Sequence, residues 1–210
     1  MQPEAVLVYE QSLMNLHVSF EDVQLFAGKE GEDEARRVYP LLTQWAGSRE
    51  SRQAVWHAGQ VLRAAKQYRS KSLRDFSAIA LYHASLALWA HAVISSPPKK
   101  RGESGRASID SGIAAENDLV WLDGEDGPGV QRFLVLQRGT PAIRRWTDNI
   151  DTERKDSYAA LSNPKAVMDI IIDILRRKSK GEDKSCPPLV ENLSQLMRDL
   201  GNAAWVMRRR

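Results

Sequence analysis

Residue types that could carry out chemistry are scattered in this sequence. His83 and His91 are eight residues apart and could share one face of a helix, but no neighbouring carboxylate or cysteine completes a set of metal ligands. We therefore expect core histidines, and interpret His57 beside Trp56 in the same way. Cys186 is the only cysteine, so the chain can form neither an internal disulfide nor a cysteine-based zinc site. A reducing, intracellular compartment fits this composition.

An acidic segment, 123–129 (DGEDGPG), resembles a calcium-binding loop in composition only. It contains Asp123, Glu125 and Asp126, but the glycine and the closing glutamate do not occur at the offsets that such a loop requires. We interpret it as a surface turn. The sequence also lacks the nucleophile elbow Gly-x-Ser-x-Gly, the phosphate-binding Gly-x4-Gly-Lys-Ser/Thr loop and the zinc-binding His-Glu-x-x-His helix. It predicts no catalytic residue, no cofactor-binding residue and no metal ligand, and hence no enzyme.

Two basic segments remain as candidate sites. Lys99, Lys100 and Arg101 lie in a stretch, 95–117, whose prolines, glycines and serines predict a flexible loop. Such a cluster suits recognition by a nuclear import receptor, and it equally suits a loop that is merely soluble. The second segment is the tail 208–210, three arginines that could contact phosphates, although we expect a solvated tail.

Composition places the chain among ordinary globular domains. Its 210 residues are 42% hydrophobic and 27% charged, which favours one domain over residues 1–210 with a sizeable core. The net charge of +3 comes from 30 basic and 27 acidic residues that are mostly interspersed. No strong overall field for nucleic acid is expected from this balance.

Apolar residues recur at helical spacing through the N-terminal half. Pro3, Ser19 and Ser48 are suited to helix starts, and Gly28 and Gly47 to helix ends.

The helix after Ser48 is amphipathic, with Val55, Ala58, Val61, Leu62 and Ala65 on one face. We expect its basic residues on the opposite, solvent-facing side: Arg52, Arg63, Lys66 and Arg69.

The stretch 76–94 runs nineteen residues without a formal charge, about the length that spans a bilayer. Its alanines, serines and histidines dilute the strongly apolar residues, so we expect a buried helix and no membrane contact. The short link to the preceding helix favours a helical hairpin.

The C-terminal half continues with short elements. Residues 120–122 predict an extended piece and 130–136 a short helix that ends near Gly139, with Pro141 confirming the break. Asn163 with Pro164 starts one helix, and the prolines at 187 and 188 open the last. The whole predicts an all-α fold, an irregular multi-helix domain with a buried central helical hairpin.

Six stretches, taken together and in order, resemble the regulatory domain of fungal transcription factors, also called the fungal-specific transcription factor or middle homology domain. They are LHVSFEDVQLFAGKEG, RQAVWHAGQVLRAA, LRDFSAIALYHASLALWAHAVI, WLDGEDGPGVQRFLVLQRGTPAIR, NPKAVMDIIIDILRR and PPLVENLSQLMRDLGNAA. The likeness covers about Leu16 to Ala204. Its nearest subgroup carries an N-terminal zinc finger of the two-cysteine, two-histidine type.

The resemblance implies an all-α domain, a nuclear location and a part in the control of RNA polymerase II transcription. DNA recognition and zinc would belong to a zinc-finger or zinc-cluster module of the parent protein, which this chain lacks. The chain is thus expected to correspond to a fragment, a truncated product or a degenerate relative. No catalytic residues carry over.

The sequence favours two functions. The first is a regulatory domain that binds transcriptional partner proteins, with self-association among its contacts. The second is a small-molecule sensor with a cavity between helices, lined by four aromatic residues: Trp56, Tyr82, Trp89 and Trp121. A closed pocket with a few convergent polar groups would favour sensing, and exposed apolar residues would favour protein binding.

Overall fold

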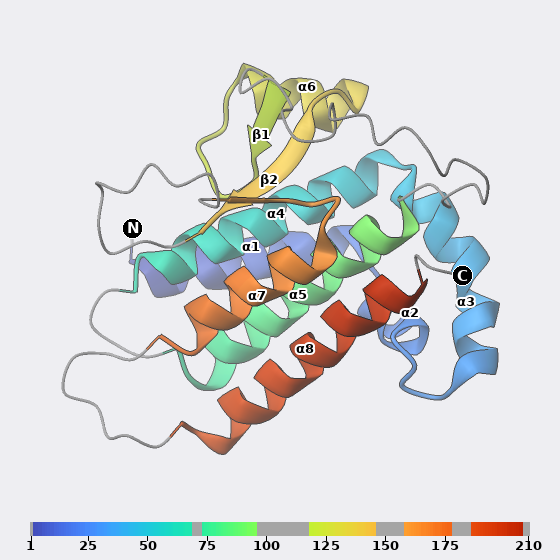
Figure 1. Cartoon of the computed structure of the whole chain (residues 1–210). Helices are drawn as coiled ribbons and strands as arrows, with labels where there is room; N and C mark the ends of the chain where they lie inside the picture. Colours follow the sequence, from blue (N-terminus) through green and yellow to red (C-terminus); the bar gives the residue numbers. More distant parts are fainter. Residues whose placement is uncertain (1, 69–72, 96–117, 146–157, 178–185, 208–210) are drawn as a thin grey trace, which may run out of the picture.

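A computed structural model describes residues 2–68, 73–95, 118–145, 158–177 and 186–207 (Figure 1). Most of these residues are helical, which confirms the prediction of a predominantly all-α domain. The expected import cluster at Lys99, Lys100 and Arg101, nearly all of the expected loop 95–117 and the basic tail 208–210 lie outside the described residues. Ser95 caps the preceding helix.

The first three helices begin where local signals place them: α1 (Pro3–His17), α2 (Phe20–Phe26) and α3 (Glu32–Ala46). Pro3 occupies the first turn of α1, and the Ser19 hydroxyl accepts a hydrogen bond from the Asp22 N–H at 3.3 Å. Three acidic residues in the first turn of α3 suit the helix dipole. Helices α2 and α3 lie together at one end of the molecule (Figure 1).

The centre of the molecule is the hairpin of α4 (Arg49–Lys66) and α5 (Asp75–Ile94), which run antiparallel (Figure 1). The Ser48 hydroxyl caps α4 by accepting from the Ser51 N–H at 3.2 Å. α5 is long and apolar enough to cross a membrane by length and composition, and 67% of its apolar window is buried inside the protein. The predicted buried hairpin is confirmed.

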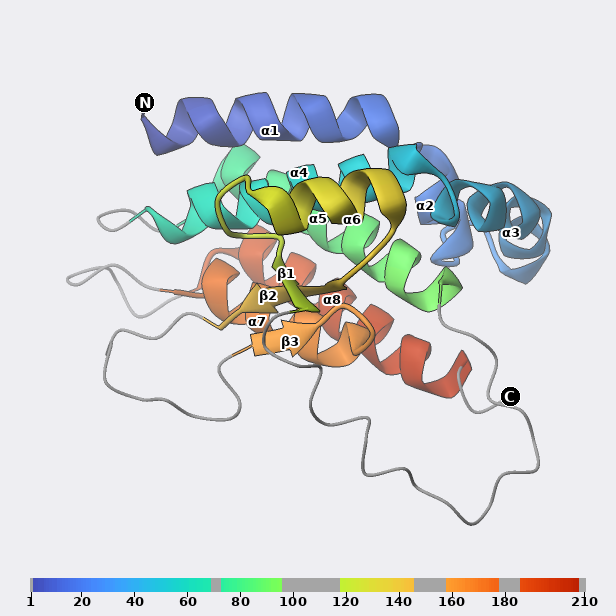
Figure 2. The same ribbon diagram turned by 90° about the horizontal axis from the view of Figure 1, so that it is seen from above.

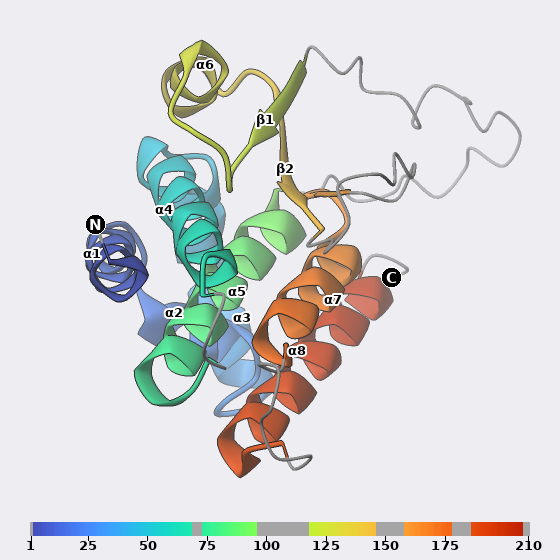
Figure 3. The same ribbon diagram turned by 90° about the vertical axis from the view of Figure 1, so that its left-hand side faces the viewer.

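Two C-terminal helices cover α5 on the side away from α1: α7 (Pro164–Leu175) and α8 (Pro188–Met207) (Figure 3). The Asn163 side chain caps α7 by accepting from the Ala166 N–H at 3.3 Å. The indole N–H of Trp89 on α5 donates to the Leu200 carbonyl of α8 at 3.0 Å inside the core. This bond fixes the two helices alongside one another.

A small sheet and one short helix complete the fold: β1 (Leu119–Trp121), α6 (Pro128–Leu136), β2 (Thr140–Arg144) and β3 (Tyr158–Ala160). β1 pairs parallel with β2, and β2 pairs antiparallel with β3. The sheet and α6 cover one side of the helical bundle, while α1 lies along another side of α4 (Figures 2 and 3).

The sequence predicted only the extended piece at β1. From the sequence, Pro141 only confirms the end of the short helix before it, yet it lies in β2 opposite Val120, and its carbonyl accepts a hydrogen bond from the Leu161 N–H at 2.8 Å. A proline lacks the N–H donor but keeps this acceptor, so a short strand tolerates it.

Candidate functional site

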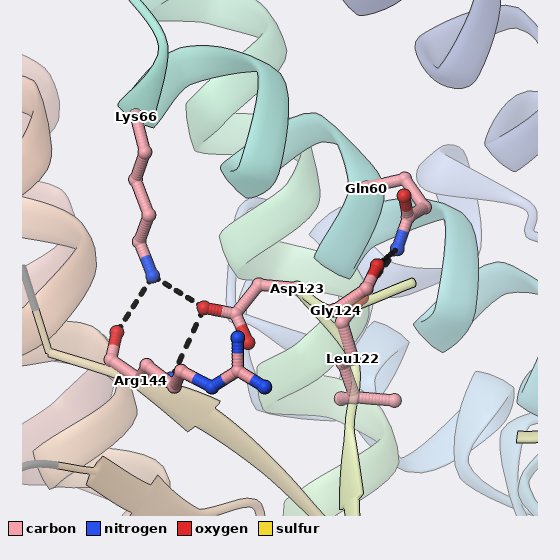
Figure 4. Close-up of polar contacts among 6 residues, drawn as sticks. All are labelled: Gln60, Lys66, Leu122, Asp123, Gly124 and Arg144. Carbon is pink, nitrogen blue, oxygen red and sulfur yellow. Dashed lines mark hydrogen bonds and ion pairs between the residues drawn. The ribbon is translucent and has the colours of Figure 1, made fainter. Parts of the chain in front are cut away.

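The best-defined polar arrangement joins α4 to the turn after β1 and to the end of β2. We call it the α4 polar cluster; its residues are Gln60, Lys66, Leu122, Asp123, Gly124 and Arg144 (Figure 4).

The cluster depends on the absence of a side chain at Gly59. A Cβ atom there would lie 2.3 Å from the Leu122 carbonyl oxygen, so only glycine lets this backbone rest on α4. One residue on, the Gln60 side-chain amide donates to the carbonyls of Leu122 at 2.8 Å and Gly124 at 3.0 Å. Arg63, one turn further along α4, donates to the Gly124 carbonyl at 2.9 Å. One face of α4 therefore holds the turn by its carbonyl groups.

The centre of the α4 polar cluster is an ion pair between Lys66 and Asp123. The Lys66 ammonium also donates to the Arg144 carbonyl at 2.6 Å, and the Arg144 N–H donates to the same Asp123 oxygen at 3.1 Å. Only 11% of the Lys66 side chain and 2% of the Asp123 side chain are exposed. The pair links the end of α4 to the turn after β1 and to β2.

Burial dominates the electrostatics of this pair. It lowers the pKa of Lys66 from its usual value, and the negative charge and hydrogen bond of Asp123 oppose that shift. The second carboxylate oxygen, Oδ1 of Asp123, is buried and accepts no hydrogen bond within the described structure. Two charges held out of water and against each other suit a structural link better than proton transfer to a ligand.

The prediction that the basic residues of α4 face solvent is wrong for two of them. Arg52 and Lys66 do not face solvent: both are buried. The Arg52 guanidinium donates to the Leu134 carbonyl of α6 at 2.9 Å and to the Ser48 carbonyl at 2.8 Å. The helical pattern alone could not indicate that carbonyl groups from distant segments would lie against this side of α4.

The interpretation of the acidic segment as a surface turn is wrong for its first residue. Asp123 is buried in the α4 polar cluster. Glu125 and Asp126 are exposed; Glu125 pairs with Arg63 and Asp126 accepts from Gln131. Gly59 on the apolar face of α4 was the signal for a close backbone contact, but it did not identify the partner.

The histidines occupy interior or half-buried positions, as predicted. His91 is buried with its ring edge-on to Trp45, and burial followed by the charge of Arg52 lowers its pKa to about 4. The His83 Nδ1 lies 3.0 Å from the Gln11 amide nitrogen, and burial lowers the pKa of His83. Within the described ranges no three potential metal ligands come together.

A pocket of about 400 Å³ lies between α7 and α8, next to the end of β2. Met168, Ile172 and Gly201 contribute its apolar wall. Its charged residues largely pair with one another: Arg145 with Asp173 at 2.8 Å and Lys165 with Asp169 at 3.4 Å.

None of the four aromatic residues proposed for a sensing cavity lines this pocket. Trp89 fills the core beside Phe26, and Trp121 lies under the Arg144 guanidinium at 4.6 Å. Trp56 and Tyr82 are half-buried and pack against the core.

Exposed large apolar residues occur on several helices. The sets are Val8, Tyr9 and Leu16 on α1, Tyr39 and Leu41 on α3, Phe76 and Ile79 on α5, Val135 and Leu136 on α6, and Leu189 and Leu196 on α8. α1 carries three of them on one short helix. Single exposed apolar residues are normal on a protein surface, so only a set that gathers on one element points to a contact.

No protein-family model, curated protein or solved structure matches this chain. The resemblance to fungal regulatory domains therefore depends on the sequence segments themselves. Two of those segments, RQAVWHAGQVLRAA and WLDGEDGPGVQRFLVLQRGTPAIR, meet directly where Gly59 and Gln60 contact Leu122.

Proposed function

We propose that this chain is a non-enzymatic regulatory domain of a fungal transcription factor, which controls RNA polymerase II transcription in the nucleus through contacts with partner proteins. DNA recognition and zinc are assigned to a zinc module of the parent protein. No cofactor and no membrane contact are assigned to the chain.

The contact between α4 and the turn after β1 is the observation that supports this proposal most. Gly59 and Gln60 come from one segment that resembles the fungal regulatory domain, and Leu122 and Asp123 come from another; Lys66 directly follows the first segment. Their polar groups form hydrogen bonds with each other inside the fold and so stabilise the structure. The exposed apolar residues on the outer helices are then the groups that remain for binding partners.

A tethering assay tests the proposal. The chain is fused to an unrelated sequence-specific DNA-binding module in a fungal cell, and transcription of a reporter is compared with that of the module alone. We expect a change of several-fold in either direction, lost in the core variant Leu86→Asp, since Leu86 is completely buried. A folded, nuclear fusion that leaves reporter transcription unchanged would contradict the proposal.

Small-molecule sensing is the alternative, and the pocket between α7 and α8 offers it little support. Its charges are mostly paired with each other, and the expected aromatic lining is elsewhere. A sensing site would instead combine an apolar enclosure with a few convergent polar groups.

A further inference from the structure

α1 carries apolar residues on both of its faces. Leu7 and Met14 are buried against the rest of the molecule. On the outer face, 47% of Val8, 58% of Tyr9 and 75% of Leu16 are exposed. A helix that covers the core with one face usually presents polar residues on the other, so this second apolar face indicates a second contact.

The outer face is also free of formal charge between its two ends. α1 contains two carboxylates: Glu4 lies in the first turn, and Glu10 points inward, 2.7 Å from the His57 ring nitrogen. The Ser12 hydroxyl donates to the Val8 carbonyl at 2.8 Å and so bonds within the helix. A second helix with the same uncharged face can therefore approach without like-charge repulsion.

The spacing and the sizes of the outer residues are self-complementary. Ala5, Tyr9, Ser12 and Leu16 are separated by four, three and four positions, the spacing of a two-helix seam. Small and large residues alternate along it. In an antiparallel pair of identical helices, the register that sets Ala5 against Leu16 of the second copy also sets Tyr9 against Ser12. Each large side chain then meets a small one, and a two-fold axis produces every contact twice.

We propose that the outer face of α1 binds the same face of a second copy of this chain, as an antiparallel helix pair. A helix of this length spans about 22 Å, and a single pair of such helices buries less surface than a standard stable interface. The dimer is accordingly weak and depends on concentration. This inference concerns the purified chain alone and does not rest on the proposed regulatory function.

Sedimentation velocity over a wide concentration series tests the dimer. The mass is expected to rise from 23.6 kDa toward twice that value. Leu16→Asp is expected to weaken the dimer at least about tenfold, because it places a charge in the seam. The matched control is Leu41→Asp, at an exposed leucine of α3, which should leave the dimer unchanged. A monomer at every concentration, or equal effects of the two variants, would overturn the proposal.

Cysteine cross-linking tests the register. In a Cys186→Ser background, chains with Ala5→Cys are mixed with chains with Leu16→Cys and treated with oxidised glutathione, which accepts the electrons of the two thiols. Disulfide-linked heterodimers should greatly exceed either homodimer. A preference for linkage between two Ala5→Cys chains would instead show a parallel pair and contradict the antiparallel register.

Discussion

At the scale of single residues, the buried polar groups of this domain hold segments together. Lys66 and Asp123 neutralise each other in the interior, and Arg52 bonds to the carbonyls at the ends of neighbouring elements. Removing one member of a buried ion pair leaves the other charged and out of water, which costs more than the net contribution of the pair.

Lys66→Met is expected to lower the free energy of unfolding by about 3–5 kcal/mol, because it leaves the Asp123 carboxylate buried without its counter-ion. The double variant Lys66→Met with Asp123→Leu removes both charges and should be more stable than the single variant. Urea unfolding followed by circular dichroism measures both. In the control Arg36→Met, the lost partner Glu32 is exposed, and the change should stay below about 1 kcal/mol. A double variant less stable than Lys66→Met would disprove this account of the pair.

His91 should make the domain sensitive to acid. Its pKa is about 4 in the folded chain and about 6.5 when unfolded, so the unfolded state binds the extra proton between these values. The contribution of the neutral His91 ring to the free energy of unfolding is fully present above pH 6.5. Between pH 6.5 and pH 4 the free energy of unfolding falls by about 1.4 kcal/mol for each pH unit. His91→Phe should flatten this part of the profile in urea titrations at several pH values. Identical slopes for both proteins would argue against a neutral, buried ring.

At the scale of elements, the position of the sheet and α6 depends on close contact with α4. The Leu122 carbonyl oxygen lies 2.3 Å from where a Cβ at position 59 would be, whereas Gly129 in the first turn of α6 has nothing within 4 Å of its own Cβ position.

Gly59→Ala is expected to destabilise the domain by about 1–3 kcal/mol or more, since backbone atoms rather than a flexible side chain must move away. Thermal unfolding measures the change. Gly129→Ala serves as the matched control and should be neutral or slightly stabilising, as alanine suits a helix better than glycine. Equal stabilities for the two variants would refute the proposed close contact.

The helices could be predicted from the sequence because their signals are local. Ser19, Ser48 and Asn163 cap the helices that follow them, and each cap bond spans only three residues. The sheet could not be predicted in this way, because each of its short strands is stabilised by pairing with a segment distant in sequence. The same holds for the α4 polar cluster, in which Lys66 and Asp123 are 57 positions apart.

At the scale of the whole molecule, α5 forms the interior, and the helices that pack directly around it are α1, α2, α3, α4, α7 and α8. Segments from both halves of the chain thus share one core. If the outer surface of this domain binds regulatory partners, the effect of the domain on transcription depends on its fold. That fold in turn depends on the contact between α4 and the turn after β1.

The tethered reporter measured with Gly59→Ala and Gly129→Ala tests this central claim most directly. Both fusions are brought to equal nuclear amounts, so that the readout reports activity per molecule. We expect Gly129→Ala to retain the effect of the unmodified chain on transcription, and Gly59→Ala to lose the effect in proportion to the folded population that thermal unfolding shows it to have lost. A full effect from Gly59→Ala, in a chain shown by circular dichroism and thermal unfolding to have lost its native packing, would contradict the account.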